Sequence, residues 1–289
     1  MVQQNENLPL FLAEATKIGQ EISITGKWVP TKKSGFFRKS TESKEMLKEW
    51  EDIHVGAKGH SGILSTEINH AVGEDAVLIH HVFKDAAALV DYFSSTGTKH
   101  IVALTQVAKP QLHMIRGVNI PDVVSKALTE KNVKGVFGEF LFGFVKDNYK
   151  RPDPETAIMV TAKWTCKPGA SNHMDELRYW WQCVGTDAYT LEEGLLRFEV
   201  YQVIGEDALI IHETFKNSDE LKFHLSKGTA EKYKKVIDKI AITEGYFFRG
   251  PVSWTIRTYS KFLRLPATYS SQGSHFTQAG GNMSDGTGD

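Results

Sequence analysis

The chain has 289 residues, of which 41% are hydrophobic and 24% charged, and its formal net charge at pH 7 is −1. This length and composition predict about two packed globular domains and exclude wholesale disorder. Basic residues are not in excess, so we expect no nucleic-acid partner and no binding to an anionic membrane surface. The two cysteines, Cys166 and Cys183, are too few for a disulfide-built or cysteine-rich metal fold, and they favour a reducing compartment.

The start of the chain shows no targeting signal. Residues 1–20, treated as an N-terminal extension, lack the basic start and the long apolar run of a signal peptide. No stretch approaches the roughly 18 apolar residues of a membrane span. We therefore expect a cytoplasmic protein without a membrane partner.

One segment of the chain occurs twice. GEDAVLIHHVFKD (73–85) and GEDALIIHETFKN (205–217) are identical at eight of thirteen positions. The offset between the first glycines, Gly73 and Gly205, equals the offset between the shared histidines, His80 and His212. The flanking segments repeat at nearly the same spacing. The sequence therefore predicts one fold written twice in tandem.

Each copy has the hydrophobic patterns of strand, helix, strand, strand, helix and strand, in that order. This order is that of the ferredoxin-like unit. A Gly-Glu-Asp turn joins the second strand to the third in both copies. The predicted elements lie at 21–35, 42–53, 63–72, 77–83, 85–93 and 111–117 in the first copy, and at 157–171, 173–184, 195–204, 209–215, 218–225 and 244–250 in the second.

The domain boundaries follow from these elements. We expect a first ferredoxin-like unit at 21–118 and a second at 157–265, the latter with a C-terminal helix. The connecting segment 119–156 is too apolar for a flexible linker, and we expect it to pack on a domain. Residues 266–289 are rich in Gly, Ser and Thr, which predicts a flexible tail.

A ferredoxin-like sheet with helices on one face leaves its other face uncovered. Since a covalent second copy is available, the two sheets could pack face to face within one chain. The predicted fold is therefore α+β: two tandem ferredoxin-like units forming an intrachain α/β barrel, with a cavity for a small-molecule ligand between the sheets. Association into a homo-oligomer stays open.

The segment LIIHETFKNSDELKFHL (209–225) resembles the antibiotic-biosynthesis-monooxygenase domain of the dimeric α/β-barrel superfamily. The resemblance covers both copies, about 21–117 and 157–250. That superfamily includes cofactor-free oxygenases of polyketide quinols, haem-degrading enzymes and proteins of no known activity, so it implies the fold better than the chemistry. It implies a cofactor-independent monooxygenase, an oxidoreductase acting on a small aromatic or polyketide-like substrate in the barrel cavity. The alternative is a non-catalytic ligand-binding or assembly protein of the same fold.

The haem-degrading branch of this superfamily is disfavoured by the residues present. That branch carries a Trp where this chain has His224, and a His where it has Lys234. It also carries an Asn on the first strand near Lys163, where this chain has none. We therefore expect no haem, no metal site and no other cofactor.

The candidate catalytic residues are His212, His80 and Arg249. Both histidines lie within apolar strands, and the intrinsic pKa of His suits proton transfer near neutral pH. A histidine in the middle of a strand is also often a core residue, and this alternative stays open. Arg249 or Lys163 would stabilise the resulting anion. The candidate substrate-binding residues are Lys163, Trp164, Tyr201, Glu213 and His224, which place the site mainly in the second copy.

Overall fold

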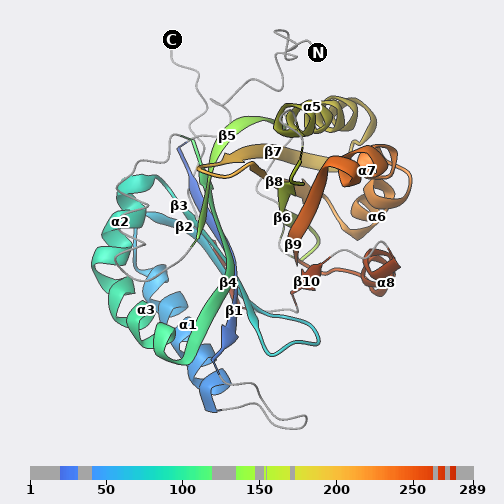
Figure 1. Ribbon diagram of the computed structural model, residues 1–289. Helices are drawn as coiled ribbons and strands as arrows, with labels where there is room; N and C mark the ends of the chain where they lie inside the picture. The colour runs from blue at the N-terminus through green and yellow to red at the C-terminus, as the bar shows by residue number, and fades with distance from the viewer. Residues whose placement is uncertain are drawn as a thin grey trace, which may run out of the picture. The chain divides into compact units, whose positions relative to one another are not determined.

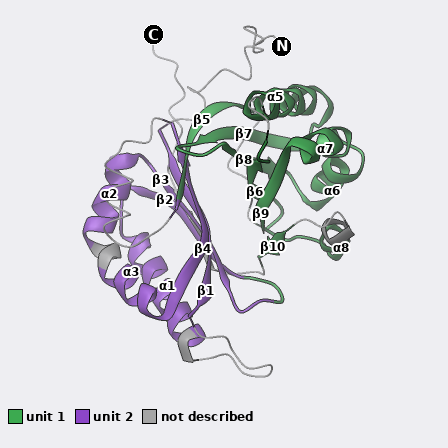
Figure 2. Ribbon diagram, in the orientation of Figure 1, with its two compact units in different colours: residues 1–18, 71–73, 136–272 green, residues 19–70, 74–135, 273–289 purple. Residues whose placement is uncertain are grey.

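The computed structural model describes residues 20–31, 41–118, 135–146, 153, 155–169, 173–262, 266–270 and 274–277. It consists of two compact units, which we call the N-terminal unit (mainly residues 19–70 and 74–135, purple in Figure 2) and the C-terminal unit (mainly residues 136–272, green in Figure 2). None of the helices described is long and apolar enough to cross a membrane.

The N-terminal unit contains the predicted order of strands and helices. Its antiparallel sheet has β1 between β4 and β3, followed by β2 and then the short strand β11. The elements are β1 (Ile22–Pro30), α1 (Thr41–Lys58), β2 (Ile63–His70), β3 (Val77–Phe83), α2 (Ala86–Ser94), α3 (Thr96–Val107), β4 (Ala108–Gly117) and β11 (Ser274–Thr277).

The C-terminal unit repeats this order and adds to it. Within this unit, β6 lies between β9 and β8, β7 follows β8, β5 pairs with β7, and β10 pairs with β9. The elements are β5 (Val136–Val145), β6 (Ile158–Cys166), α5 (His173–Leu191), β7 (Leu195–Val203), β8 (Ala208–Phe215), α6 (Ser218–Ser226), α7 (Thr229–Ile240), β9 (Ala241–Arg249), α8 (Trp254–Phe262) and β10 (Ala267–Tyr269).

The α+β fold with two ferredoxin-like units is thus confirmed. The predicted barrel concerns the packing of one unit on the other, and it stays a prediction.

Equivalent local signals build both units. Gly73 and Gly205 take positive φ angles of 77° and 80° in the turn before the third strand, a conformation that Gly adopts without strain. The helix after that strand is capped in both units by a side-chain oxygen. Asp85 accepts from the backbone N–H of Ala88 in one unit, and Asn217 caps α6 in the other. These turns and caps fix where β3, β8, α2 and α6 begin.

The core of the C-terminal unit lies between its sheet and its helices. Figure 1 shows α5, α6 and α7 on one side of strands β6 to β9. Alternate strand residues point to this side, as Val160 and Trp164 do on β6, and they pack against Leu177 and Trp181 of α5. The residues between them point to the opposite face of the sheet. This alternation decides which side chains can share a site.

Two chain segments form strands that the sequence analysis did not predict. The connecting segment contributes β5, which pairs with β7 along most of its length. The tail that we expected to be flexible from residue 266 forms β10, which pairs in parallel with β9, and β11, which pairs with β2. Composition misled here because one buried aromatic residue suffices to anchor a short strand. Residues 278–289 and 1–19 lie outside the described part of the chain.

Tyr269 is that anchor, and replacing it by Ala should lower the free energy of unfolding of the C-terminal unit by about 3 kcal/mol. Its ring is stacked on Phe248 at 5.1 Å between centroids, and both residues are buried. Urea unfolding measures the change. Trp254→Ala is the control because Trp254 is 77% exposed, so its loss should cost less than about 0.5 kcal/mol. Equal effects would mean that β10 adds no stability.

Candidate functional site

The two faces of the C-terminal sheet separate the residues that the sequence singled out. Trp164 and Glu213 point to the helix-covered face, where His224 of α6 meets them. The cross-strand pairs Thr161–His212, Lys163–Ile210 and Met159–Arg249 belong to the opposite face. The remaining residue of the predicted set, Tyr201, is paired with Ile210 and shares that face. The structure therefore brings together Trp164, Glu213 and His224, and places His212, Arg249, Lys163 and Tyr201 elsewhere.

The histidines of the opposite face pair with hydroxyl groups. His212 Nδ1 lies 3.0 Å from Thr161 Oγ1, and its Nε2 lies 3.5 Å from Thr214 Oγ1. The N-terminal unit repeats the arrangement, with His80 Nδ1 at 2.9 Å from Thr25 Oγ1. All these residues are buried. Such pairs satisfy buried polar groups, which is the role of a core histidine.

Lys163 on the same face is also engaged. Its Nζ lies 2.5 Å from Glu206 Oε2 and 3.0 Å from Glu244 Oε2. Burial alone would lower the pKa of Lys163, but the hydrogen bonds to the two carboxylates outweigh it and the pKa is raised. Lys163 is therefore a structural cation held by two acids.

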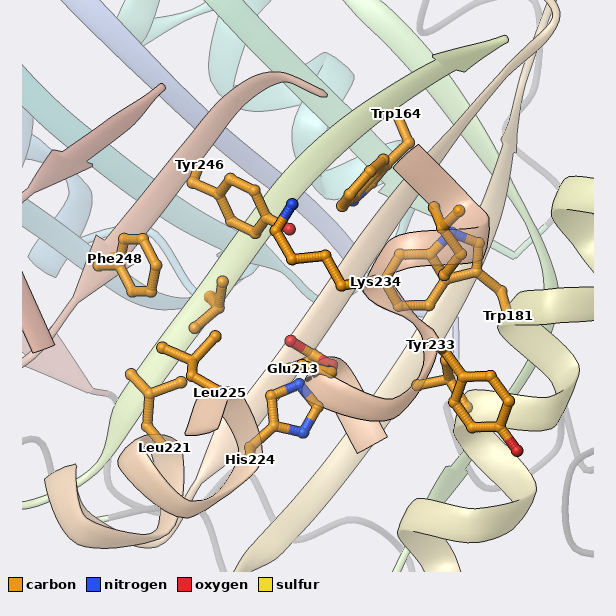
Figure 3. Close-up of a pocket in the computed structure, with 14 residues that line it drawn as sticks. Trp164, Trp181, Glu213, Leu221, His224, Leu225, Tyr233, Lys234, Tyr246 and Phe248 are labelled. Atoms are coloured by element: carbon orange, nitrogen blue, oxygen red, sulfur yellow. Dashed lines mark ion pairs between the residues drawn. The ribbon is translucent and has the colours of Figure 1, made fainter. Parts of the chain in front are cut away.

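A pocket opens on the helix-covered face of the C-terminal sheet (Figure 3). Its volume is about 40 Å³, where roughly 10–15 Å³ suffices for one water molecule, so it has room for about three water molecules. The walls are mostly apolar and aromatic, and few polar groups reach the interior. The lining residues are Val160, Trp164, Trp181, Val184, Glu213, Leu221, His224, Leu225, Ala230, Tyr233, Lys234, Ile237, Tyr246 and Phe248.

Three ionisable side chains meet beside this pocket. His224 Nδ1 lies 2.8 Å from Glu192 Oε2, and His224 Nε2 lies 3.4 Å from Glu213 Oε1. All three side chains are buried. Glu213 and His224 line the pocket, where a dashed line joins them in Figure 3, and Glu192 is not among the lining residues. The chain thus carries a carboxyl–imidazole–carboxylate series that ends at the pocket wall.

The local backbone explains this placement. The cap at Asn217 starts α6 so that His224 falls in its last turn. The loop that follows contains Gly228, where a Cβ atom would come within 2.5 Å of Glu192 Oε1. Without that atom, the backbone N–H of Thr229 donates to Glu192 Oε1 at 2.6 Å. Glu192 is therefore held by a backbone donor on one side and by His224 on the other.

The protonation states follow from burial and from the neighbouring charges. Burial raises the pKa of Glu213, and the charge of His224 only partly offsets this. Burial alone would lower the pKa of His224, but the charge of Glu213 and the hydrogen bond to Glu192 outweigh it and the pKa is raised. For Glu192, the hydrogen bonds from His224 and Thr229 overcome the effect of burial, and the pKa is lowered. Glu192 and His224 form an ion pair, and burial favours the protonated form of Glu213.

The N-terminal unit has an equivalent pair of contacting tryptophans but different side chains in place of Glu213 and His224. Trp28 and Trp50 meet edge to face at 5.5 Å and 71°, as Trp164 and Trp181 do at 5.6 Å and 67°. The sequence repeat aligns His81 with Glu213 and Tyr92 with His224. The buried Tyr92 hydroxyl donates to the carbonyl of Ile53 at 3.3 Å. The acid–imidazole pair is thus replaced by two rings.

In the N-terminal unit, a third ring, that of His113, occupies the position equivalent to Tyr246 of the C-terminal unit. His113 of β4 is paired with Gly26 of β1, just as Tyr246 is paired with Ala162. A Cβ atom on Gly26 would come within 2.0 Å of the His113 ring, so the glycine makes space for it. Burial lowers the pKa of both His81 and His113 to about 3, with the charges of His54 and His113 adding to the effect at His81. Both imidazoles are neutral at physiological pH.

The described residues include one group with the donors and spacing of a metal site. Glu49, Asp52 and His100 on α1 and α3 place one ligand atom each within 4.8 Å of one another. His100 Nδ1 lies 3.0 Å from Glu49 Oε2, which accounts for the cluster as a hydrogen-bonded contact between α1 and α3.

Several pocket residues were missed by sequence reasoning. Glu192 follows the end of α5 and meets a partner 32 positions away, which no periodicity indicates. Tyr233 and Tyr246 were read only as parts of a helix and of a strand. A signal did exist for Trp181, because the repeat aligns it with Trp50.

Comparison with known proteins identifies structures with a similar fold but no family and no curated relative. No protein-family model matches the chain, and no curated protein matches it. Among solved structures, a candidate monooxygenase from Fusobacterium nucleatum subsp. nucleatum is similar over 90% of this chain and 99% of that chain, with 13% identity and a TM-score of 0.50. At this identity the similarity shows a shared fold, which agrees with the resemblance seen in the sequence.

Two further structures are similar at lower scores. A candidate monooxygenase from Lactobacillus acidophilus has 10% identity and a TM-score of 0.47, and the match covers 89% of this chain and 99% of that chain. An anthrone oxidase-like protein also has 10% identity and a TM-score of 0.47, over 80% of this chain and 90% of that chain.

Proposed function

We propose that this protein is a cofactor-independent monooxygenase that binds a small aromatic or polyketide-like substrate in the pocket of the C-terminal unit. One observation carries the proposal: the buried pair of Glu213 and His224 in the wall of a pocket that is otherwise apolar and aromatic. A carboxyl group with a raised pKa is suited to proton transfer near neutral pH. The monooxygenase-like fold supports the reaction class.

The proposed site differs from the one that the sequence ranked first. We had placed the substrate in a barrel cavity, with His212 as the base and Arg249 or Lys163 stabilising the anion. The pocket instead lies between sheet and helices, and the residues that line it do not include those three. Trp164, Glu213 and His224 are the residues shared by the predicted set and the pocket.

The reaction needs a substrate carbon with acidic hydrogens and molecular oxygen as the oxidant. Glu213, as carboxylate, removes a proton from an activated CH₂ group, and the protonated His224 donates a hydrogen bond to that carboxylate. The carbanion gives its electrons to dioxygen, and one oxygen atom becomes bound to carbon. Loss of water then leaves a carbonyl: CH₂ plus O₂ becomes C=O plus H₂O, a four-electron oxidation matched by the four-electron reduction of dioxygen. The apolar walls keep bulk water from the carbanion.

Glu213→Gln should lower the turnover rate about a hundredfold, because the base is lost while the shape of the pocket is kept. Oxygen uptake is measured with a panel of aromatic quinols and ketones that contain an activated CH₂ group. In the unmodified protein the rate should rise with pH through the raised pKa of Glu213, because the carboxylate is the active form.

Glu231→Gln is the matched control, since Glu231 is an exposed residue of α7 outside the pocket, and it should turn over at the unmodified rate. His212→Ala should cost less activity than Glu213→Gln, because these neighbours on β8 point to opposite faces. Full activity of Glu213→Gln would refute the assigned base. Tight binding of the panel without oxygen uptake would favour the ligand-binding alternative.

A further inference from the structure

The pocket is lined by two cationic side chains, whereas the carboxylates paired with them at 2.8 Å or closer are not lining residues. His224 and Lys234 both line the pocket. Their partners Glu192 and Asp238, the latter paired with Lys234 one helical turn along α7, are not among the lining residues. Glu213 is the one carboxyl group of the lining, and burial favours its neutral form. While Glu213 is neutral, a ligand in the pocket therefore meets the positive charges of His224 and Lys234 without a facing negative charge.

One buried donor in the lining has no protein partner. Within the described residues, the indole Nε1 atom of Trp181 forms no hydrogen bond, although its side chain is buried. The indole N–H of Trp164, by contrast, interacts with the Tyr246 hydroxyl. An unmet buried donor costs about 1–3 kcal/mol, so the Trp181 group calls for an explanation. A ligand with an acceptor oxygen would satisfy it.

Lys234 lies on the same wall as these aromatic residues. Figure 3 shows its side chain running along the pocket in the direction of Tyr246. The ammonium group has three N–H donors, of which the bond to Asp238 uses one. The others remain for a ligand. The charges that face Lys234 are those of Asp238 on its own helix and of Glu213 and His224 across the pocket, with the neutral hydroxyls of Tyr233 and Tyr246 in the lining.

We propose that the pocket is an oxyanion site that selects an aromatic ligand as its phenolate or enolate, with Lys234 as the anion-binding residue and the indole N–H group of Trp181 as a further donor. This inference rests on the proposed function for the pocket, and it names the substrate class: acidic phenols and enols. In the reaction, Glu213 takes the proton and the oxyanion stays opposite Lys234.

Para-nitrophenol tests the inference because its phenolate absorbs visible light and its neutral form does not. Titrating the ligand with and without protein gives its pKa in both states. Binding should lower the pKa of para-nitrophenol by about one unit, which corresponds to a tenfold preference for the phenolate. Lys234→Met should abolish this shift. Nitrobenzene, which lacks the ionisable oxygen, should bind the unmodified and Lys234→Met proteins equally, and this shows that the variant pocket is intact.

Lys235→Met is the control for charge, since Lys235 is the exposed neighbour of Lys234 on α7, and the shift should persist in this variant. A bound para-nitrophenol with an unchanged or raised pKa would overturn the proposal, as would a shift that survives Lys234→Met. The test is one of binding alone. A lowered pKa of bound para-nitrophenol without oxygen uptake would therefore support the oxyanion site and refute the monooxygenase. Oxygen uptake without a lowered pKa would refute the oxyanion site and support the monooxygenase.

Discussion

Replacing His224 by Ala should lower the free energy of unfolding of the C-terminal unit by about 3–5 kcal/mol. His224 is the buried cation of an ion pair with Glu192, whose Oε2 lies 2.8 Å from His224 Nδ1. Removing the imidazole leaves the Glu192 carboxylate in the interior with the backbone and side-chain donors of Thr229 but without its cation. The loss combines an uncompensated buried charge with a cavity against Phe215, whose ring centroid lies 5.1 Å from that of His224.

Urea unfolding of the C-terminal unit measures this loss. Lys222→Ala is the matched control on α6, because Lys222 is exposed, and its effect should stay within about 0.5 kcal/mol. In the double variant His224→Ala with Glu192→Gln, the unmet charge is gone, so the combined loss should be smaller than the sum of the single losses. Additive losses would show that Glu192 and His224 act independently.

Acid should weaken the N-terminal unit by about 4 kcal/mol between pH 8 and pH 5. His81 and His113 have a folded-state pKa of about 3 against an ordinary value of 6.5. Because the folded state disfavours the proton, their stabilising contribution is fully present above pH 6.5 and is lost as the pH falls from there toward 3. At pH 5 the unfolded chain has bound both protons and the folded unit neither, which costs about 2 kcal/mol for each histidine.

Denaturant unfolding at several pH values, combined with hydrogen exchange read peptide by peptide, locates this loss. His113→Tyr introduces the ring that the C-terminal unit has at the equivalent position, and it should remove about half of the pH dependence. His70→Gln is the control, because His70 is exposed at the end of β2. An N-terminal unit equally stable at pH 5 and pH 8 would contradict the lowered pKa values.

Most of the fold could be predicted from the sequence because its signals are local. The turn glycines Gly73 and Gly205, the caps Asp85 and Asn217 and the strand alternation each act within a few residues. The strand β10 could not be predicted, because Tyr269 is a single aromatic residue in a polar context whose partner, Phe248, lies on another strand.

The candidate site was only partly predictable, for two physical reasons. Neighbouring strand residues such as His212 and Glu213 point to opposite faces, and the sequence does not tell which face retains space for a ligand. The charge partner of His224 is Glu192, and that contact depends on how the end of α5 packs beside α6 and α7. Local pattern placed His224 on a helix, but only tertiary packing determines the groups around it.

The contact between Gly26 and His113 restricts which residue position 26 tolerates. In the C-terminal unit the paired positions are held by Ala162 and Tyr246, and the alanine methyl group leaves that pair intact. In the N-terminal unit the same methyl group would collide with the imidazole ring. With His113 in place, Gly26→Ala alone should be destabilising, so the residue tolerated at position 26 depends on the residue at position 113. Single substitutions therefore cannot easily convert this pair into the Ala–Tyr pair of the C-terminal unit.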